Sequence, residues 1–291
     1  MIDYRLLQAL VEVIQQGGFE RAAQQLHLTQ SAISQRIAQL ERQLGQPVLL
    51  RRTPPEPTAL GLRLCNHYQQ VRQLETGLEL DVSDQLSPQV IRLTTNADSL
   101  ATWLPAALAQ VTQHRAVSFD LVVEDQDVGL KRMKAGEVMA CLCSSAQAVN
   151  GARVSYLGKM RYRALLSPQL RKRWQDLISQ QLHQLPCLVY SRDDQLQHRF
   201  LKSQLGLEQQ PTHIHFCPSS EGFVKMALAG VGFGMIPQLQ VQEHLDQGAL
   251  VDLLPDHHLD IPLYWHGWQT QSPLLNELEQ AVSQVAKAVL V

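Results

Sequence analysis

The sequence contains no apolar run of 18 residues and only five cysteines, and each shortage argues against a class of protein. Without such a run, no membrane-spanning helix is expected. Five cysteines in 291 residues are few and odd in number, so a disulfide-stapled secreted domain is not expected. The N-terminus lacks a basic segment followed by an apolar core and a cleavage site, which argues against secretion. Together these features predict a cytoplasmic protein.

Extremes of composition and of net charge are also missing. Apolar residues make up 45% and charged residues 18%, as in folded globular proteins rather than disordered ones. The length of 291 residues predicts two domains, with room for a small third. The net charge is −2, but residues 1–64 hold seven arginines against five acids, or +2, and no lysine precedes Lys131. The arginine side chain binds phosphates and guanine edges well. A charge of only +2 in 64 residues does not by itself predict DNA binding, so a sequence motif is needed to support it.

Helical spacing in the first 45 residues predicts three helices. Apolar residues recur helically over 6–14, and Gly17 and Gly18 are expected to end that helix. A short second helix is expected from Phe19. Thr29 is expected to cap a third helix that ends at Gly45. A short helix, a turn of about three residues and a longer helix form a helix-turn-helix pattern.

The exposed face of the third helix is rich in short polar and amide side chains, which suit base edges. A short apolar run after residue 46 ends in two arginines and two prolines, which predicts a hairpin or wing. The candidate DNA-binding residues are Gln30, Ser31, Ser34, Gln35, Arg36, Arg51 and Arg52. We expect Gln30, Ser34 and Gln35 to contact base edges. Ser31 and the two wing arginines should contact the DNA backbone. The alternative is that all of them face solvent.

A longer helix is predicted from Thr58 to about Val82. Its apolar residues recur in mixed steps of three and four, close to a heptad repeat. A helix with such a stripe is expected to pair with a second subunit. Packing against its own domain is the alternative.

Strands and helices alternate after a polar linker at 81–88. Strands are expected at 90–95, 117–123, 139–143, 188–190, 213–216 and 235–236, and helices at 100–111, 128–135, 198–205, 223–229 and 273–290. A polar turn is expected at 96–99. This alternation predicts a parallel α/β sheet.

The segment from Phe19 to Glu41, FERAAQQLHLTQSAISQRIAQLE, resembles the helix-turn-helix of LysR-type transcriptional regulators. Residues 45–51 are similar to that family's wing, and residues 58–61 to the start of its linker helix. Leu49 departs from the pattern, because phenylalanine is usual there. The strings NADSLATWL (96–104), SSEGFV (219–224), MIPQLQ (235–240) and LYWH (263–266) resemble the ArgP subfamily, whose members respond to arginine and lysine and activate basic amino-acid export.

The resemblance implies an α/β protein with an N-terminal winged helix-turn-helix, a long linker helix and a two-lobed α/β effector domain of the periplasmic-binding-protein type. The expected parts are a DNA-binding domain at 1–57, a linker and dimerisation helix at 58–87, a first lobe at 88–161 plus 265–291, and a second lobe at 162–264. Crossover strands are expected near 146–162 and 262–267, and the last helix should return to the first lobe.

A cleft between two such lobes is the expected effector site, because strand ends and helix N-termini converge there and favour an anion. The candidate effector-binding residues are Asp98, Ser99, Glu124, Ser219, Ser220 and Glu221. The serines at the two helix starts are expected to hold a carboxylate. Asp98 and Glu221 are the favoured partners of a side-chain cation. Alternatively, each acid only caps its helix. L-lysine or L-arginine is the expected effector, and no cofactor is expected.

Other chemistry is not expected. Cys141 and Cys143 share one strand face, as do His213, His215 and Cys217, but neither set completes a tetrahedral metal site, and a buried cysteine is often just a small hydrophobe. No nucleophile elbow or dinucleotide-binding loop is present, so neither an enzyme nor catalytic residues are expected.

The sequence thus predicts a transcription regulator that binds double-stranded DNA as a homodimer or homotetramer, with RNA polymerase as a further candidate partner and no membrane association. The alternatives are a regulator of another effector, an architectural or replication-origin DNA-binding protein, a solute-binding receptor and a metal sensor.

Overall fold

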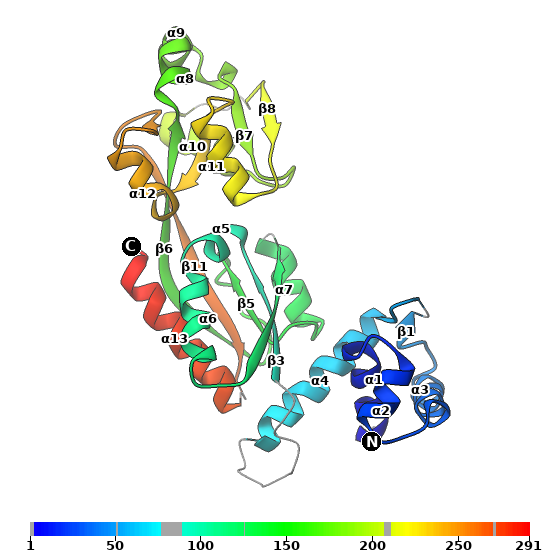
Figure 1. Cartoon of the computed structure of the whole chain (residues 1–291). Helices are drawn as coiled ribbons and strands as arrows, with labels where there is room; N and C mark the ends of the chain where they lie inside the picture. Colours follow the sequence, from blue (N-terminus) through cyan, green and yellow to red (C-terminus); the bar gives the residue numbers. More distant parts are fainter. Residues whose placement is uncertain (1–2, 51, 77–88, 125, 207–210, 270–271) are drawn as a thin grey trace.

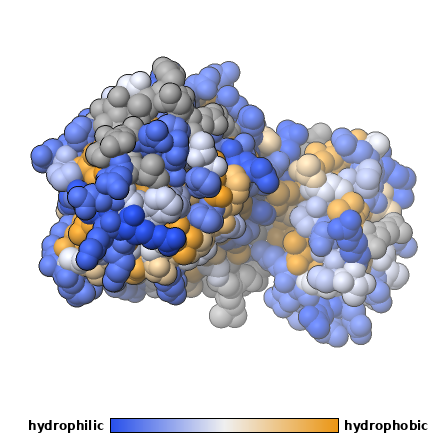
Figure 2. Space-filling view, turned by 90° about the horizontal axis from the view of Figure 1, so that it is seen from above, coloured by the Kyte–Doolittle hydropathy of each residue, from blue (hydrophilic) through white to orange (hydrophobic). Residues whose placement is uncertain are grey.

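The computed structural model describes residues 3–50, 52–76, 89–124, 126–206, 211–269 and 272–291. A small N-terminal helical unit leads through a long helix to two α/β lobes, and the second lobe lies at the far end of the molecule (Figure 1). None of the described helices is long and apolar enough to cross a membrane. Seen from above, hydrophilic residues cover most of the surface and apolar residues appear in separate patches (Figure 2).

The N-terminal unit has three helices: α1 (Tyr4–Gln15), α2 (Phe19–Gln25) and α3 (Gln30–Leu44). The Thr29 hydroxyl accepts a hydrogen bond from the backbone N–H of Ala32 at 3.2 Å, as expected of an N-cap. Gly45 ends α3 in the left-handed conformation with φ +69°, which glycine adopts without strain. Both sequence-based predictions of the limits of α3 are therefore confirmed.

A small hairpin and helix α4 follow. Strand β1 (Leu49–Leu50) pairs antiparallel with β2 (Glu56–Pro57), and α4 spans Ala59–Thr76. The Thr58 hydroxyl accepts from the Gly61 N–H at 3.1 Å and so caps α4. Leu64 and Tyr68 of α4 are buried in the core of the N-terminal unit, so part of the apolar stripe packs against its own domain. The predicted helix end near Val82 lies outside the described residues.

The main sheet has seven strands in the order β10-β6-β11-β5-β3-β4, with β9 also paired to β6. Its strands are β3 (Gln89–Thr95), β4 (Val117–Val123), β5 (Ala140–Cys143), β6 (Ala152–Leu166), β9 (Gly234–Pro237), β10 (Val251–Asp252) and β11 (His258–Trp268). A second sheet pairs β7 (Cys187–Val189) with β8 (Ile214–Phe216) in parallel.

The predicted parallel sheet is present only in part. Strands β3, β4 and β5 are parallel, but β11 runs antiparallel to both β5 and β6. The long strands β6 and β11 connect the two lobes (Figure 1). The chain leaves the first lobe along β6 and returns along β11, so these two strands must run in opposite directions. The expected crossover strands are present, although they begin at Ala152 and His258 rather than near 146 and 262.

The remaining helices flank these sheets. They are α5 (Ala97–Ala101), α6 (Leu104–Thr112), α7 (Gln126–Lys134), α8 (Pro168–Arg173), α9 (Gln175–Gln180), α10 (Leu196–Leu205), α11 (Ser220–Leu228), α12 (Gln238–Asp246) and α13 (Pro273–Val289), with a 3-10 turn at Leu182–Gln184. We call the part containing β3–β5, α5–α7 and α13 the first lobe, and the part containing α8–α12 and β7–β10 the second lobe. Helix α13 returns to the first lobe and packs against α6, as expected.

One predicted helix is divided in two. The sequence pattern indicated a polar turn at 96–99 and a helix over 100–111, but residues 96–99 start α5 and a break at Thr102 separates it from α6. Pro105 lies in the first turn of α6, where its missing N–H is tolerated, but the same ring prevents α5 from continuing through it. Helices α8, α9 and α12 were not anticipated either.

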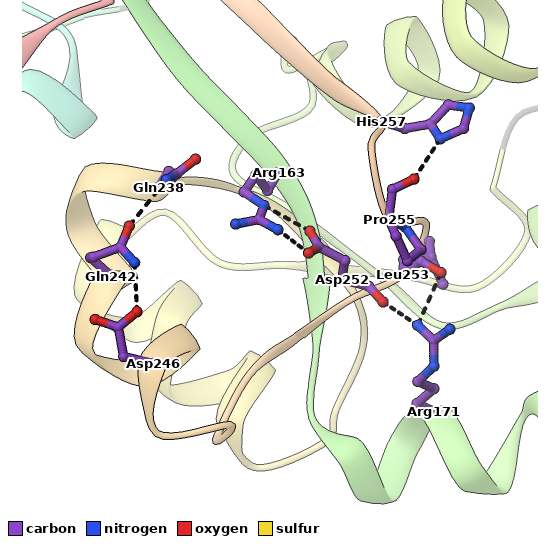
Figure 3. Close-up of polar contacts among 9 residues, drawn as sticks. All are labelled: Arg163, Arg171, Gln238, Gln242, Asp246, Asp252, Leu253, Pro255 and His257. Atoms are coloured by element: carbon purple, nitrogen blue, oxygen red, sulfur yellow. Dashed lines mark hydrogen bonds and ion pairs between the residues drawn. The ribbon is translucent and has the colours of Figure 1, made fainter.

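Arginine side chains form hydrogen bonds between the crossover strand β6 and elements of the second lobe. Arg163 of β6 donates to both carboxylate oxygens of Asp252, and Arg171 of α8 donates to the carbonyls of Asp252 and Leu253 (Figure 3). Nearby, Arg161 and Asp260 lie opposite each other on β6 and β11 and form two bonds of 2.9 Å. These contacts hold β6, β10 and β11 together where the crossover strands enter the second lobe.

Candidate functional site

One face of the first two turns of α3 points outward. Gln30, Ser31, Ser34 and Gln35 are exposed, and Arg36 is half-buried. The opposite face buries Ile33, Ile37 and Leu40 in the domain core. The predicted base-reading side chains therefore lie together at the N-terminal end of one exposed helix face, as in a recognition helix.

Arg52 lies on the hairpin after α3. Its side chain is exposed and pairs with the Glu56 carboxylate at 3.1 Å. An exposed pair of this kind contributes little, so a phosphate could replace Glu56 at small cost. Arg51 lies outside the described residues.

The lobes meet at the carboxylate of Asp98. Tyr162 of β6 donates its hydroxyl to Asp98 Oδ2 at 2.7 Å, and Ser220 at the start of α11 donates to Asp98 Oδ1 at 2.9 Å. Ser220 Oγ also lies 3.2 Å from Gln240 Oε1 at the start of α12. Asp98 belongs to the first lobe, Ser220 and Gln240 to the second, and Tyr162 to the strand between them. We call these four residues the Asp98 cluster.

The Asp98 cluster contains no basic side chain. Burial raises the pKa of Asp98, although the hydrogen bonds from Tyr162 and Ser220 oppose that rise. Burial, together with the nearby Asp98 charge, also raises the pKa of Tyr162 well above its ordinary value. No arginine, lysine or histidine among the described residues forms an ion pair with Asp98. A cation placed here would relieve the cost of burying this carboxylate.

The other predicted effector residues have different surroundings. Ser219 is exposed and caps α11 by accepting from the Gly222 N–H at 3.1 Å. Ser99 is fully buried, and its hydroxyl has no hydrogen-bond partner among the described residues. Glu221 is exposed in the first turn of α11. Glu124 is bound by Arg132 rather than by the Asp98 cluster.

Sequence and structure comparisons identify the family. Residues 4–62 match the bacterial regulatory helix-turn-helix protein, lysR family, and residues 84–287 match the LysR substrate binding domain. The chain belongs to the LysR family of transcriptional regulators. The HTH-type transcriptional regulator ArgP of Pseudomonas fluorescens is 51% identical over 100% of this chain and 98% of its own length. ArgP of Pseudomonas aeruginosa is 52% identical over 96% of this chain and 94% of its own. The chain therefore also belongs to the ArgP group within the LysR family.

Solved LysR structures share the fold. The crystal structure of ArgP from Mycobacterium tuberculosis has a TM-score of 0.80 and 33% identity, covering 100% of this chain and 99% of that one. LysG from Corynebacterium glutamicum with bound effector Arg has a TM-score of 0.71 and 28% identity, covering 99% of each chain. As a LysR-family protein, the chain is an effector-responsive DNA-binding regulator and not an enzyme.

Two members of the Asp98 cluster, Tyr162 and Gln240, were not among the predicted site residues of this LysR regulator. Gln240 lies in one of the subfamily strings, whereas Tyr162 follows an arginine in an expected strand and carries no local signal. Only their contacts with Asp98 and Ser220 reveal them.

The cysteine motifs do not form a metal site in the described part of the chain. No group of three His, Cys, Asp or Glu residues there is arranged to hold a metal ion. Cys141 and Cys143 are buried on β5 beside His266 of β11. A hydrogen bond from the Cys141 thiol lowers the pKa of Cys143. His213 and His215 lie exposed at the edge of the second lobe.

Proposed function

We propose that this LysR regulator binds a basic amino acid, L-arginine or L-lysine, between its two lobes, and that binding changes how the N-terminal domains hold operator DNA. The observation that carries the proposal is the Asp98 carboxylate of the first lobe, which accepts hydrogen bonds from Ser220 of the second lobe and from Tyr162 of the strand between them, and has no cationic partner among the described residues. LysG from Corynebacterium glutamicum carries arginine as its bound effector, which supports the same ligand class.

Each end of such a ligand has a complementary partner. The Asp98 carboxylate suits an ammonium or guanidinium group, because charge-assisted hydrogen bonds are the stronger ones. The ligand carboxylate suits the N-terminus of α11, where the hydroxyls of Ser219 and Ser220 lie beside the first backbone N–H groups of the helix. Ser99 is buried next to Asp98, and its hydroxyl bonds to no other group in the described part of the chain. Glu221, at the exposed start of α11, is a second candidate for the ligand cation.

The DNA contacts follow from the exposed face of α3. We infer that Gln30, Ser34 and Gln35 read base edges, while Ser31, Arg51 and Arg52 contact the DNA backbone. Arg36 is a further candidate for DNA contact. In the cytoplasm, a homodimer or homotetramer would present one such helix per subunit to matching half-sites on double-stranded DNA, and RNA polymerase is a further candidate partner. The proposed parts remain 1–57 for DNA binding, 58–87 for linking and dimerisation, 88–161 with 265–291 for the first lobe, and 162–264 for the second.

Calorimetric titration of the purified protein tests the ligand. L-arginine and L-lysine are injected, with L-leucine and L-glutamate as controls that share the α-amino and α-carboxyl groups but lack the side-chain cation. Saturable binding of the basic amino acids alone is the expected result. Binding of leucine or glutamate with equal affinity, or no binding of arginine or lysine, would overturn the proposal and leave the DNA-binding function intact.

A further inference from the structure

A hydrogen bond joins the linker helix α4 to the turn after α7 in the first lobe. The Asn66 side chain on α4 donates to the backbone carbonyl of Gly136 at 3.0 Å, and Asn66 is only 5% exposed. Gly136 follows α7 with φ +69°, and its N–H bonds to the Met133 carbonyl at 2.9 Å. The turn that follows α7 is therefore the part of this segment that reaches α4. A movement of the turn at Gly136 would therefore displace the Asn66 side chain and, with it, α4.

Arg132 of α7 holds that turn. Its Nη1 donates to Glu137 Oε2 at 2.9 Å, and its backbone carbonyl accepts from the Glu137 N–H at 2.9 Å. Glu137 directly follows Gly136 in the chain. The side chains of Arg132 and Glu137 are 33% and 18% exposed, so water screens the pair only partly.

The same guanidinium also reaches toward the effector site. Arg132 Nε and Nη2 donate to Glu124 Oε1 at 2.8 and 2.5 Å. The Glu124 N–H donates to the Thr95 carbonyl at 3.1 Å. Thr95 ends β3, and the next residue, Asn96, caps α5 by accepting from the Ser99 N–H. Glu124 is thus bonded to the strand end from which the helix carrying Asp98 begins.

We propose that Arg132 couples the effector site to the DNA-binding unit: through Glu124 it bonds to the base of α5, and through Glu137 it positions the turn that Asn66 of the linker helix binds. This inference rests on the proposed function for the identity of the ligand, but the bonded path itself does not require it. The Arg132 guanidinium binds the carboxylates of both Glu124 and Glu137. When one of these carboxylates moves, the guanidinium moves with it, and its hydrogen bond to the other carboxylate changes. A shift of α5 on ligand binding is therefore passed to α4 as a shift of the turn at Gly136.

The expected signature is a loss of coupling without a loss of binding. Coupling between two sites is reciprocal, so arginine should change DNA affinity by the same factor by which DNA changes arginine affinity. Arg132 and Asn66 belong to neither proposed binding surface. Replacing either should leave each affinity near the wild-type value when measured alone, while the factor that links them should approach one.

The experiment uses the full chain and a DNA duplex selected from a random pool by the wild-type protein. Arginine affinity is measured by calorimetry with and without this duplex for the wild type, Asn66→Ala, Arg132→Gln and the double variant. We expect a wild-type factor of about 5 to 150, as is typical of allosteric proteins, and factors within about twofold of one for all three variants. Arg115→Gln is the matched control, since it removes an ion pair with Glu277 in the same lobe that is not part of the bonded path through Arg132, and it should keep the wild-type factor. A wild-type factor in either Asn66→Ala or Arg132→Gln would overturn the coupling role.

A second arm separates failure of this inference from failure of the proposed ligand. If the wild type binds neither arginine nor lysine, Asp98→Asn replaces the ligand as the perturbation of the site. We then expect Asp98→Asn to change DNA affinity in the wild-type background and to have no effect when Arg132→Gln is also present. An equal change in both backgrounds, or no change in either, would overturn the coupling.

Discussion

Ser220 in the second lobe donates a hydrogen bond of 2.9 Å to Asp98 in the first, on the carboxylate that also accepts from Tyr162 at 2.7 Å. The carboxylate that joins the lobes is thus also one that forms no ion pair within the described residues. A basic ligand that reaches Asp98 would compete with Ser220 for the same oxygen. If the ligand binds as proposed, ligand binding and lobe arrangement are linked through the Asp98 side chain.

Asp98→Asn should weaken arginine binding by about 10- to 100-fold, because a hydrogen bond to a charged group contributes about 1.5–3 kcal/mol. The amide keeps the size of the side chain and removes its charge. Calorimetry measures the affinity, and Asp120→Asn, on the exposed edge strand β4, is the matched control. If Asp98→Asn binds arginine as tightly as the wild type, Asp98 does not hold the ligand cation.

Effector binding should release protons. Burial raises the pKa of Asp98 in the free protein, and a ligand cation beside it would lower that pKa again. Affinity should therefore rise with pH through the raised pKa of Asp98. The stability of the ligand-free protein should depend on pH in the opposite direction. The contribution of Asp98 to the free energy of unfolding is present below the ordinary carboxyl pKa and is lost as the pH rises through the raised pKa of Asp98 in the folded protein.

Titrations in buffers of different ionisation enthalpy, between about pH 4 and 8, measure the protons released around carboxyl and histidine pKa values. The Asp98→Asn variant should release fewer. Equal proton release by both proteins would assign the titration to another group.

Gly61→Ala should destabilise the DNA-binding unit by about 1–3 kcal/mol, the usual cost of overpacking. A Cβ at residue 61 would overlap the Val48 carbonyl oxygen, so α4 could not keep its close approach to the hairpin. Chemical unfolding measures the change. Gly18→Ala serves as control, since its Cβ would meet no atom within 4 Å. Equal stability of the two variants would show that the hairpin yields without cost.

Ser34→Tyr should abolish sequence-specific DNA binding while leaving oligomerisation unchanged. The side chain is exposed on α3, so the ring would fill the space that a base edge needs without disturbing the core. Gel-shift titration against specific and random duplexes measures the specificity ratio, and Gln284→Tyr on the exposed face of α13 is the control. Should the ratio survive in Ser34→Tyr, another element reads the sequence.

The sequence by itself determined the local structure of the DNA-binding unit. Thr29, Gly45 and Thr58 mark helix limits through hydrogen bonds and backbone conformations that involve only near neighbours, and the apolar spacing of α3 sets which face is exposed. Such features depend on residues within about one helical turn, so they can be read from the chain alone.

The tertiary structure alone decided the antiparallel crossover and the composition of the Asp98 cluster. Strand direction depended on where the chain crosses between lobes, and Tyr162 meets Asp98 across 64 residues of sequence. It also showed that Glu124 bonds to Arg132 instead of joining the Asp98 cluster. Pairings of this kind result from packing among distant elements, and no spacing rule within one element specifies them.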